Sequence, residues 1–161
     1  MYKRQRHILA QLPGIQALIA SSGATHVLLQ DDASGATLLG RAENDAVPIA
    51  SLTKLITAMV VLDTAPDLDR RIVIDEQDAQ ATAASASALP VGTATTLDTL
   101  LKLALMSSDN RAAHALARSY PGGETAFRAA LQRKTAALHL QHTTLEEPTG
   151  LSGTNLSLIH I

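Results

Sequence analysis

The chain has 161 residues and a formal net charge of −2, which fits one globular domain and excludes the broad positive surface of a nucleic-acid-binding protein. Hydrophobic residues make up 46% and charged residues 17%, so the chain can build a packed core and does not have the composition of a disordered segment. Cysteine is absent, which excludes disulfide frameworks and cysteine-based zinc sites, and the absence of tryptophan argues against base-stacking platforms for single-stranded nucleic acid.

The start of the chain predicts neither a membrane span nor an intact secretion signal. Residues 1–7 are basic, like the first region of a signal peptide, but the following stretch 8–20 is interrupted by Pro13 and Gly14. No apolar run in the sequence approaches the length of a membrane-spanning helix.

The two ends share an unusual coding relationship. Met1–Gln5, with Met1 read from a GTG start codon, and Leu156–His160 can be encoded by DNA sequences that are reverse complements of each other, as in the transposase ends used to prepare sequencing libraries. We therefore expect residues 1–5 and 156–161 to be translated adapter, and residues 6–155 to be a gene fragment.

Residues 25–40 predict a β-hairpin. Thr25–Gln30 is apolar and suited to a strand, Asp31–Gly35 is a turn cluster, and Ala36–Gly40 resumes the extended pattern. Pro48 disfavours helix at the residue before it, so a connector is expected ahead of the next element.

Residues 51–63 are expected to form a helix that is buried on most of its surface. Its apolar residues recur on one side at helical spacing: Leu52, Leu55, Ile56, Met59 and Val60, with Val61 and Leu62 widening the stripe. A short strand is expected at 71–75, whereas residues 79–88 are rich in alanine, serine and threonine and predict no clear element.

Three more helices are expected in the second half. Thr96 is a candidate N-cap for the first, in which apolar residues repeat at helical spacing up to Leu105. Ser107–Asn110 interrupts this pattern, and further helices are expected at about 111–117 and 124–138. A hairpin followed by a helical cluster predicts an α+β fold.

The clearest chemical pattern is Ser51 followed three positions later by Lys54. On a helix these side chains share one face with Cβ atoms about 5–6 Å apart, so the amine can reach the hydroxyl. A serine hydroxyl needs a base to take its proton, and an ammonium cannot serve. We therefore expect burial among Leu55, Ile56 and Met59 to lower the pKa of Lys54. The backbone N–H of Ser51 is expected where an oxyanion would form.

Ser108, Asp109 and Asn110 form a second polar pattern between two expected helices. Ser108 can relay a proton to a departing amine, and Asn110 can hydrogen-bond a peptide carbonyl. Taken singly, each pattern has a structural alternative: a capping serine with a surface lysine, or a helix N-cap. The two patterns about fifty residues apart favour chemistry over these alternatives.

The two patterns match the S-x-x-K and S-x-N motifs of penicillin-binding proteins and serine β-lactamases. Over about residues 25–155 the chain resembles the low-molecular-mass penicillin-binding D-alanyl-D-alanine peptidases, above all their endopeptidase branch. The segments that match in order are Pro48–Asp63, Leu89–Gly92, Leu103–Ala113, Tyr120–Gly123 and Glu147–Ser152.

This resemblance implies a truncated β-lactamase/transpeptidase-like fold whose C-terminal sheet strands are missing. It implies that Ser51 is the acylated nucleophile, with Lys54 as its base. Ser108 would be a further catalytic residue and Asn110 a substrate-binding residue. It also implies action on peptidoglycan stem peptides in the periplasm, inhibition by β-lactam antibiotics, and no metal or cofactor. Membrane attachment stays open.

The chain departs from the family pattern at two places. The family's Lys-Thr-Gly motif is missing and is expected beyond Asn155, so the fragment itself could lack activity. Lys134-Thr135-Ala136 lies in a helical pattern, has alanine in place of the glycine, and is not expected to substitute. The stretch Ala83–Ala88 lacks the basic and glycine residues expected there.

Two other functions stay open from the sequence. One is a class A-like β-lactamase, and the other is a catalytically silent domain that recognises penicillin or binds the cell wall. His139 and His142 are spaced three apart, but a surface position is expected for both rather than a metal site.

Overall fold

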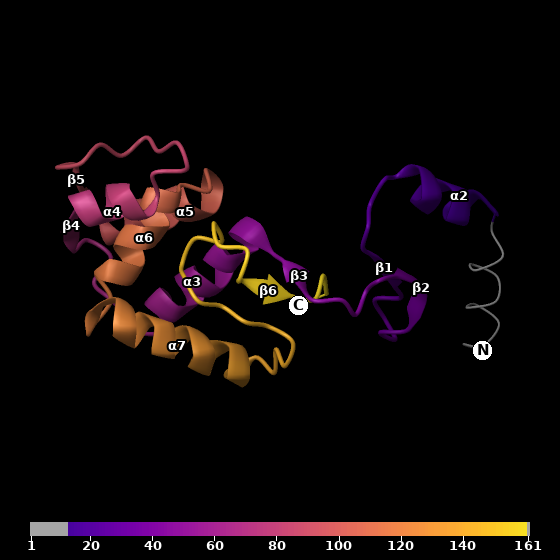
Figure 1. Ribbon diagram of the computed structural model, residues 1–161. Coiled ribbons are helices and arrows are strands. Elements are labelled where there is room, and N and C mark those ends of the chain that lie inside the picture. The colour runs from indigo at the N-terminus through magenta and orange to yellow at the C-terminus, as the bar shows by residue number, and fades with distance from the viewer. Residues whose placement is uncertain (1–12, 161) are drawn as a thin grey trace. The chain divides into compact units, whose positions relative to one another are not determined.

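The computed structural model describes residues 13–160, which divide into two units (Figure 1). The smaller unit holds the described residues up to Val47 and those from Ser157 onward, and the larger is Pro48–Leu156. The adapter segment expected at residues 1–5 lies outside the described residues.

The smaller unit contains the predicted hairpin. Strand β1 (Val27–Gln30) pairs antiparallel with β2 (Thr37–Arg41), with Val27 opposite Arg41. In the turn, the side chain of Asp31 accepts hydrogen bonds from the N–H groups of Ala33 and Ser34. The hairpin is preceded by helix α2 (Pro13–Ser21), which was not predicted. Its first residue is proline. The first N–H groups of a helix have no partner within the helix, so proline, which lacks an N–H, loses no hydrogen bond at this position.

The larger unit is a helical cluster with one small sheet. Its helices are α3 (Thr53–Leu62), α4 (Glu76–Ala81), α5 (Leu97–Met106), α6 (Asn110–Arg118) and α7 (Gly123–Ala137). Strands β4 (Arg71–Val73) and β5 (Ala94–Thr96) pair antiparallel. The two-residue strands β3 (Val47–Pro48) and β6 (Leu156–Ser157) stand at the unit boundaries. Helix α3 packs against α5, α6 and α7, and Figure 1 shows α7 running beside it.

The core of this unit is aliphatic, with a single phenylalanine. Its largest fully buried apolar side chains are Val60, Ile74, Leu97, Leu100, Leu116, Phe127 and Leu131. The ring of Phe127 meets that of Tyr120 edge to face at 5.6 Å. Among residues 13–160, no helix has the length and apolar character required to cross a membrane.

Side-chain caps begin three of the helices. Thr96 accepts from the N–H of Thr99, as predicted, and Asp109 accepts from the N–H of Ala112. Helix α4 was not predicted, because it lacks an apolar repeat. A reciprocal capping box between Asp75 and Asp78 holds it instead.

Helix α3 is buried on most of its surface, as expected, since seven of its ten residues are buried, but several residues of the predicted apolar stripe lie on its exposed side. Leu52 before the helix and Leu55 within it are 50% and 53% exposed, and Met59 and Leu62 are also exposed. The buried face carries polar residues beside the apolar ones: Thr53, Lys54, Ile56, Thr57, Ala58, Val60 and Val61. Apolar periodicity does not reveal a face that is buried through hydrogen bonds.

Candidate active site

Ser51 lies in a single 3-10 turn (Ala50–Leu52) that leads into α3. Its Oγ accepts two hydrogen bonds, one from Nζ of Lys54 at 3.1 Å and one from the hydroxyl of Ser108 at 2.7 Å. The structure therefore brings together three of the four residues that the sequence singled out.

Lys54 is 2% exposed, so its amine lies almost entirely out of water. Burial lowers the pKa of Lys54 below the ordinary lysine value, while the negative charges of Glu147 and Asp109 oppose that shift. Leu55 and Met59, which were expected to cover the amine, are themselves exposed. The amine instead donates a 2.7 Å hydrogen bond to the backbone carbonyl of Thr149.

Ser108 occupies the joint between α5 and α6 with a φ of +55°, a conformation that residues other than glycine rarely adopt. Asp109 holds this joint on both sides. Its carboxylate caps α6 and also accepts hydrogen bonds from the hydroxyl of Ser87 and the N–H of Ala88. Ser87 and Ala88, which lie in a stretch where the sequence predicted no element, thus bind the residue that follows Ser108.

Asn110 is the first residue of α6. Its Oδ1 atom is buried without a hydrogen-bond partner in the described part of the chain. Among the described residues it has no hydrogen bond to Ser51, Lys54 or Ser108, so the structure does not connect it to that three-residue group.

A turn at residues 147–155 closes the other side of Lys54, and sequence reasoning assigned it no role. The carboxylate of Glu147 accepts hydrogen bonds from the backbone N–H groups of Thr149 and Gly150, at 2.7 Å and 2.6 Å. Gly150 has a φ of +82°, and a Cβ atom there would lie 1.9 Å from the carbonyl oxygen of Ala50. The only sequence signal for the turn was its match to the family pattern.

An open cavity of about 340 Å³ gives access to the group. Ser51, Lys54 and Ser108 line it together with Ile49, Leu52, Leu55, Ala104 and Leu105. A nucleophilic hydroxyl, a buried amine with a lowered pKa and a second hydroxyl share one cavity. This arrangement suits covalent catalysis at an acyl carbon.

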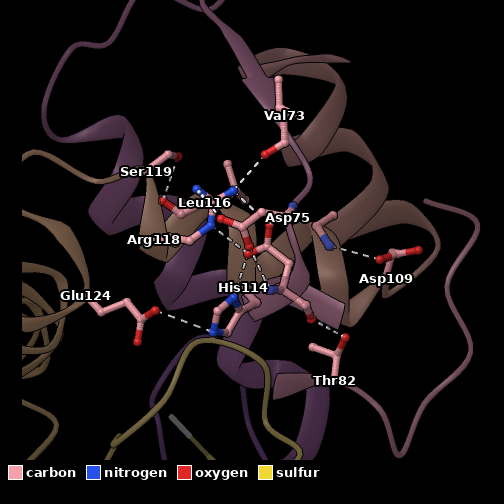
Figure 2. A network of polar contacts seen from close by, with 11 residues as sticks. Val73, Asp75, Thr82, Asp109, His114, Leu116, Arg118, Ser119 and Glu124 are labelled. Carbon is pink, nitrogen blue, oxygen red and sulfur yellow. Dashed lines mark hydrogen bonds and ion pairs between the residues drawn. The ribbon is translucent and has the colours of Figure 1, made fainter. Parts of the chain in front are cut away.

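A second polar cluster joins α4 to α6 and is shown in Figure 2. The buried carboxylate of Asp78 contacts Nδ1 of His114 at 2.7 Å and accepts two hydrogen bonds from Arg118, at 2.8 and 2.9 Å. Burial alone would raise the pKa of Asp78, but hydrogen bonds from His114 and Arg118 hold it far below its usual range. His114 is therefore held in a structural network.

The other residues considered in the sequence analysis are not part of the three-residue group. Lys134 and Thr135 lie in α7, as expected, and Lys134 pairs with Asp63 at 2.5 Å. His139 and His142 are both exposed. Within residues 13–160 there is no group of three or more histidine, cysteine, aspartate or glutamate side chains that could hold a metal ion.

Comparison with known proteins gives one consistent family. A family model described as D-alanyl-D-alanine carboxypeptidase matches residues 15–158. The chain is 44% identical over 148 residues to a D-alanyl-D-alanine endopeptidase of Pseudomonas aeruginosa, covering 92% of this chain and 46% of the relative. It is 37% identical to the D-alanyl-D-alanine endopeptidase of Escherichia coli, covering 88% of this chain and 49% of the relative.

Solved structures agree with the sequence relatives. A D-alanyl-D-alanine carboxypeptidase from Mycobacterium tuberculosis superposes with a TM-score of 0.68 at 33% identity, over 84% of this chain and 51% of that one. A DD-transpeptidase from Streptomyces gives a TM-score of 0.70 at 28% identity, over 80% and 53%. The predicted truncated α+β fold is thus confirmed, and the chain spans about half the length of the curated relatives it matches.

Proposed function

Because the chain belongs to the D-alanyl-D-alanine carboxypeptidase family, we propose that it carries the nucleophile of a serine-type D-alanyl-D-alanine peptidase. The substrates are peptidoglycan stem peptides, and the action is that of an endopeptidase or carboxypeptidase in the periplasm. The observation that carries the proposal is the pair of hydrogen bonds that Ser51 Oγ accepts, from Lys54 and from Ser108.

The proposed reaction starts with the neutral form of Lys54. Its Nζ takes the proton of the Ser51 hydroxyl as Oγ attacks the carbonyl carbon of a D-alanine residue. The peptide C–N bond then breaks, an ester forms on Ser51, and the leaving amine receives a proton through the Ser108 hydroxyl. Water hydrolyses the ester and regenerates Ser51.

Asn110 has the remaining proposed role, which is to bind substrate. The expected contact is a hydrogen bond that its side-chain amide N–H donates to a carbonyl oxygen of the bound peptide. β-Lactam antibiotics would acylate Ser51 by the same attack, since they also present a carbonyl carbon to the nucleophile.

We also propose that residues 6–155 belong to a longer peptidase domain, which the half-length match to the relatives supports. On this view residues 1–5 and 156–161 are adapter-encoded. Sequencing the genomic locus tests this directly. A native reading frame that continues through residues 156–161 would refute the adapter origin of that segment.

The test of function uses the complete gene product that contains residues 6–155. A fluorescent penicillin should label the wild-type protein and fail to label Ser51→Ala. Labelling that persists in Ser51→Ala would refute the assignment. Steady turnover of penicillin would instead favour a β-lactamase, and cell-wall binding without hydrolysis of stem peptides would favour a silent domain.

A further inference from the structure

The Lys54 amine is held by two acceptors of different character. It donates to Ser51 Oγ at 3.1 Å and to the Thr149 carbonyl oxygen at 2.7 Å. A carbonyl oxygen only accepts, so one N–H of the amine always points at Thr149. A neutral amine has two N–H groups and one lone pair. When Lys54 is neutral, Thr149 still holds one of its N–H groups. The amine can then turn its lone pair, in place of an N–H, toward the Ser51 hydroxyl and accept its proton.

The Thr149 carbonyl is in turn fixed by one carboxylate. Glu147 accepts from the N–H of Thr149 at 2.7 Å, from its hydroxyl at 2.6 Å, and from the N–H of Gly150 at 2.6 Å. It also accepts from Nδ2 of Asn155 at 2.9 Å. These hydrogen bonds all converge on the carboxylate of Glu147. Hydrogen bonds to an ionised carboxylate are shorter and stronger than neutral ones, so Glu147 is the main residue that holds the turn in shape.

Further bonds seat the turn on the same face of α3 that carries Lys54. The hydroxyl of Thr57 donates to the carbonyl of Pro148 at 2.8 Å, and Nδ2 of Asn155 donates to the hydroxyl of Thr53 at 3.1 Å. All of Thr53, Lys54 and Thr57 are buried. The turn therefore has a fixed place against the helix, and its shape depends on Glu147.

We propose that Glu147 is a positioning residue, whose carboxylate fixes the 147–150 turn so that the Thr149 carbonyl holds the Lys54 amine against Ser51. This inference rests on the proposed function, because it assigns a role in activating Ser51. Glu147 touches neither Ser51 nor the cavity that Ser51 lines, so it acts only through Thr149 and through its charge.

The negative charge of Glu147 should affect the pKa of Lys54, and simple loss of structure would not produce the pattern of pKa changes expected in the two Glu147 variants. Burial lowers the pKa of Lys54, and the negative charges of Glu147 and Asp109 oppose the shift. Glu147→Gln removes one of these charges, so the pKa of Lys54 should fall further. Glu147→Asp keeps the charge but shortens the side chain, so it should disturb the turn while leaving that pKa close to its wild-type position.

The experiment measures the rate constant for acylation by a fluorescent penicillin as a function of pH, in the complete gene product. Glu147→Gln should slow acylation per folded molecule by about 10- to 100-fold, the cost of misplacing a catalytic group by about 1 Å. The acidic limb of its pH–rate profile, where the acylation rate rises as Lys54 loses its proton, should also move to lower pH. Glu147→Asp should recover part of the rate with the limb unmoved. The matched control is Glu146→Gln, since Glu146 is exposed and, among the described residues, its side chain bonds only the Thr154 hydroxyl.

Titration of Lys54 by ¹³C NMR, with its signal assigned through Lys54→Arg, separates this inference from the proposed function. If penicillin fails to label the wild type, the proposed function fails, and the titration still decides the role of Glu147. A Lys54 titration that is unchanged in Glu147→Gln, or that shifts equally in Glu146→Gln, would overturn the inference. If Glu147→Gln does not fold, Glu147→Asp decides, and a wild-type acylation rate in that variant would overturn it.

Discussion

Gly150 lies directly against the backbone carbonyl of Ala50, the residue before the proposed nucleophile. Both residues have positive φ, +82° for Gly150 and +46° for Ala50. A Cβ atom on Gly150 would lie 1.9 Å from the Ala50 oxygen and 2.3 Å from its carbonyl carbon. The turn that holds Lys54 and the turn that carries Ser51 are thus in backbone contact, and this contact requires glycine.

Gly150→Ala should therefore destabilise the protein through two separate effects. A left-handed φ costs a residue other than glycine about 1–2 kcal/mol, and forcing a methyl group into a filled space adds about 1–3 kcal/mol. Urea denaturation measures the sum. Gly92→Ala is the matched control, because Gly92 has a φ of +87° and empty space where its Cβ would lie. Equal loss of stability in both variants would contradict the close contact.

Lys54→Arg should abolish acylation while keeping a cation at the site. A guanidinium is not deprotonated in proteins, so it cannot take the Ser51 proton. Loss of a general base costs about 10²- to 10⁴-fold in rate, and the fluorescent-penicillin assay measures it. Lys102→Arg, at an exposed side chain paired with Asp98, should leave the rate unchanged. An acylation rate in Lys54→Arg close to wild type would exclude Lys54 as the base.

The acylation rate of the wild-type protein should rise with pH as Lys54 loses its proton. Because burial lowers the pKa of Lys54, this rise should occur below the pH at which an ordinary lysine titrates, about 10.5. The same initial-rate assay, run over a pH series, gives the profile. A midpoint at the ordinary lysine value would show that the amine is solvated when it acts.

Asp78→Asn should remove a pH-dependent part of the stability. The pKa of Asp78 is lower in the folded state than in the unfolded chain, so its contribution is complete above the unfolded pKa of about 3.9 and is lost as the pH falls below it. Breaking a buried ion pair costs about 3–5 kcal/mol at neutral pH.

Thermal unfolding at several pH values should show the wild type losing stability toward acid more steeply than Asp78→Asn. The matched control is Asp98→Asn, which breaks an exposed pair with Lys102 and should change stability by less than about 1 kcal/mol. Parallel acid profiles for the wild type and Asp78→Asn would refute the assigned role of this carboxylate.

Local features of the fold could be predicted from the sequence. Thr96 as an N-cap depends on neighbouring residues alone, and so does the hairpin at residues 25–40. Likewise, the spacing of Ser51 and Lys54 was enough to predict their contact, since three positions make one turn. Helix α4 was missed because a capping box and the buried Asp78 hold it, and neither produces apolar periodicity.

The long-range parts of the site could not be derived from local pattern. Ser108 and Ser51 are 57 positions apart, and only the family resemblance suggested that they meet. The partner of Lys54 is a backbone carbonyl, that of Thr149, 95 positions away. Every residue has such a carbonyl, so no residue type marks it in the sequence. The exposed side of α3 was mispredicted for a related reason. The opposite side carries the polar residues Thr53, Lys54 and Thr57, which are buried by hydrogen bonds to the turn at residues 147–155.

Mapping the penicillin adduct in the complete gene product tests the central claim most directly. Tryptic cleavage after Arg41 and Lys54 gives a peptide of residues 42–54 whose one serine is Ser51, while Ser108 falls in a separate peptide of residues 103–111. We predict that mass spectrometry will find the acyl group on Ser51 in the first peptide. An adduct on the second peptide, or a stable adduct in Ser51→Ala, would contradict the account.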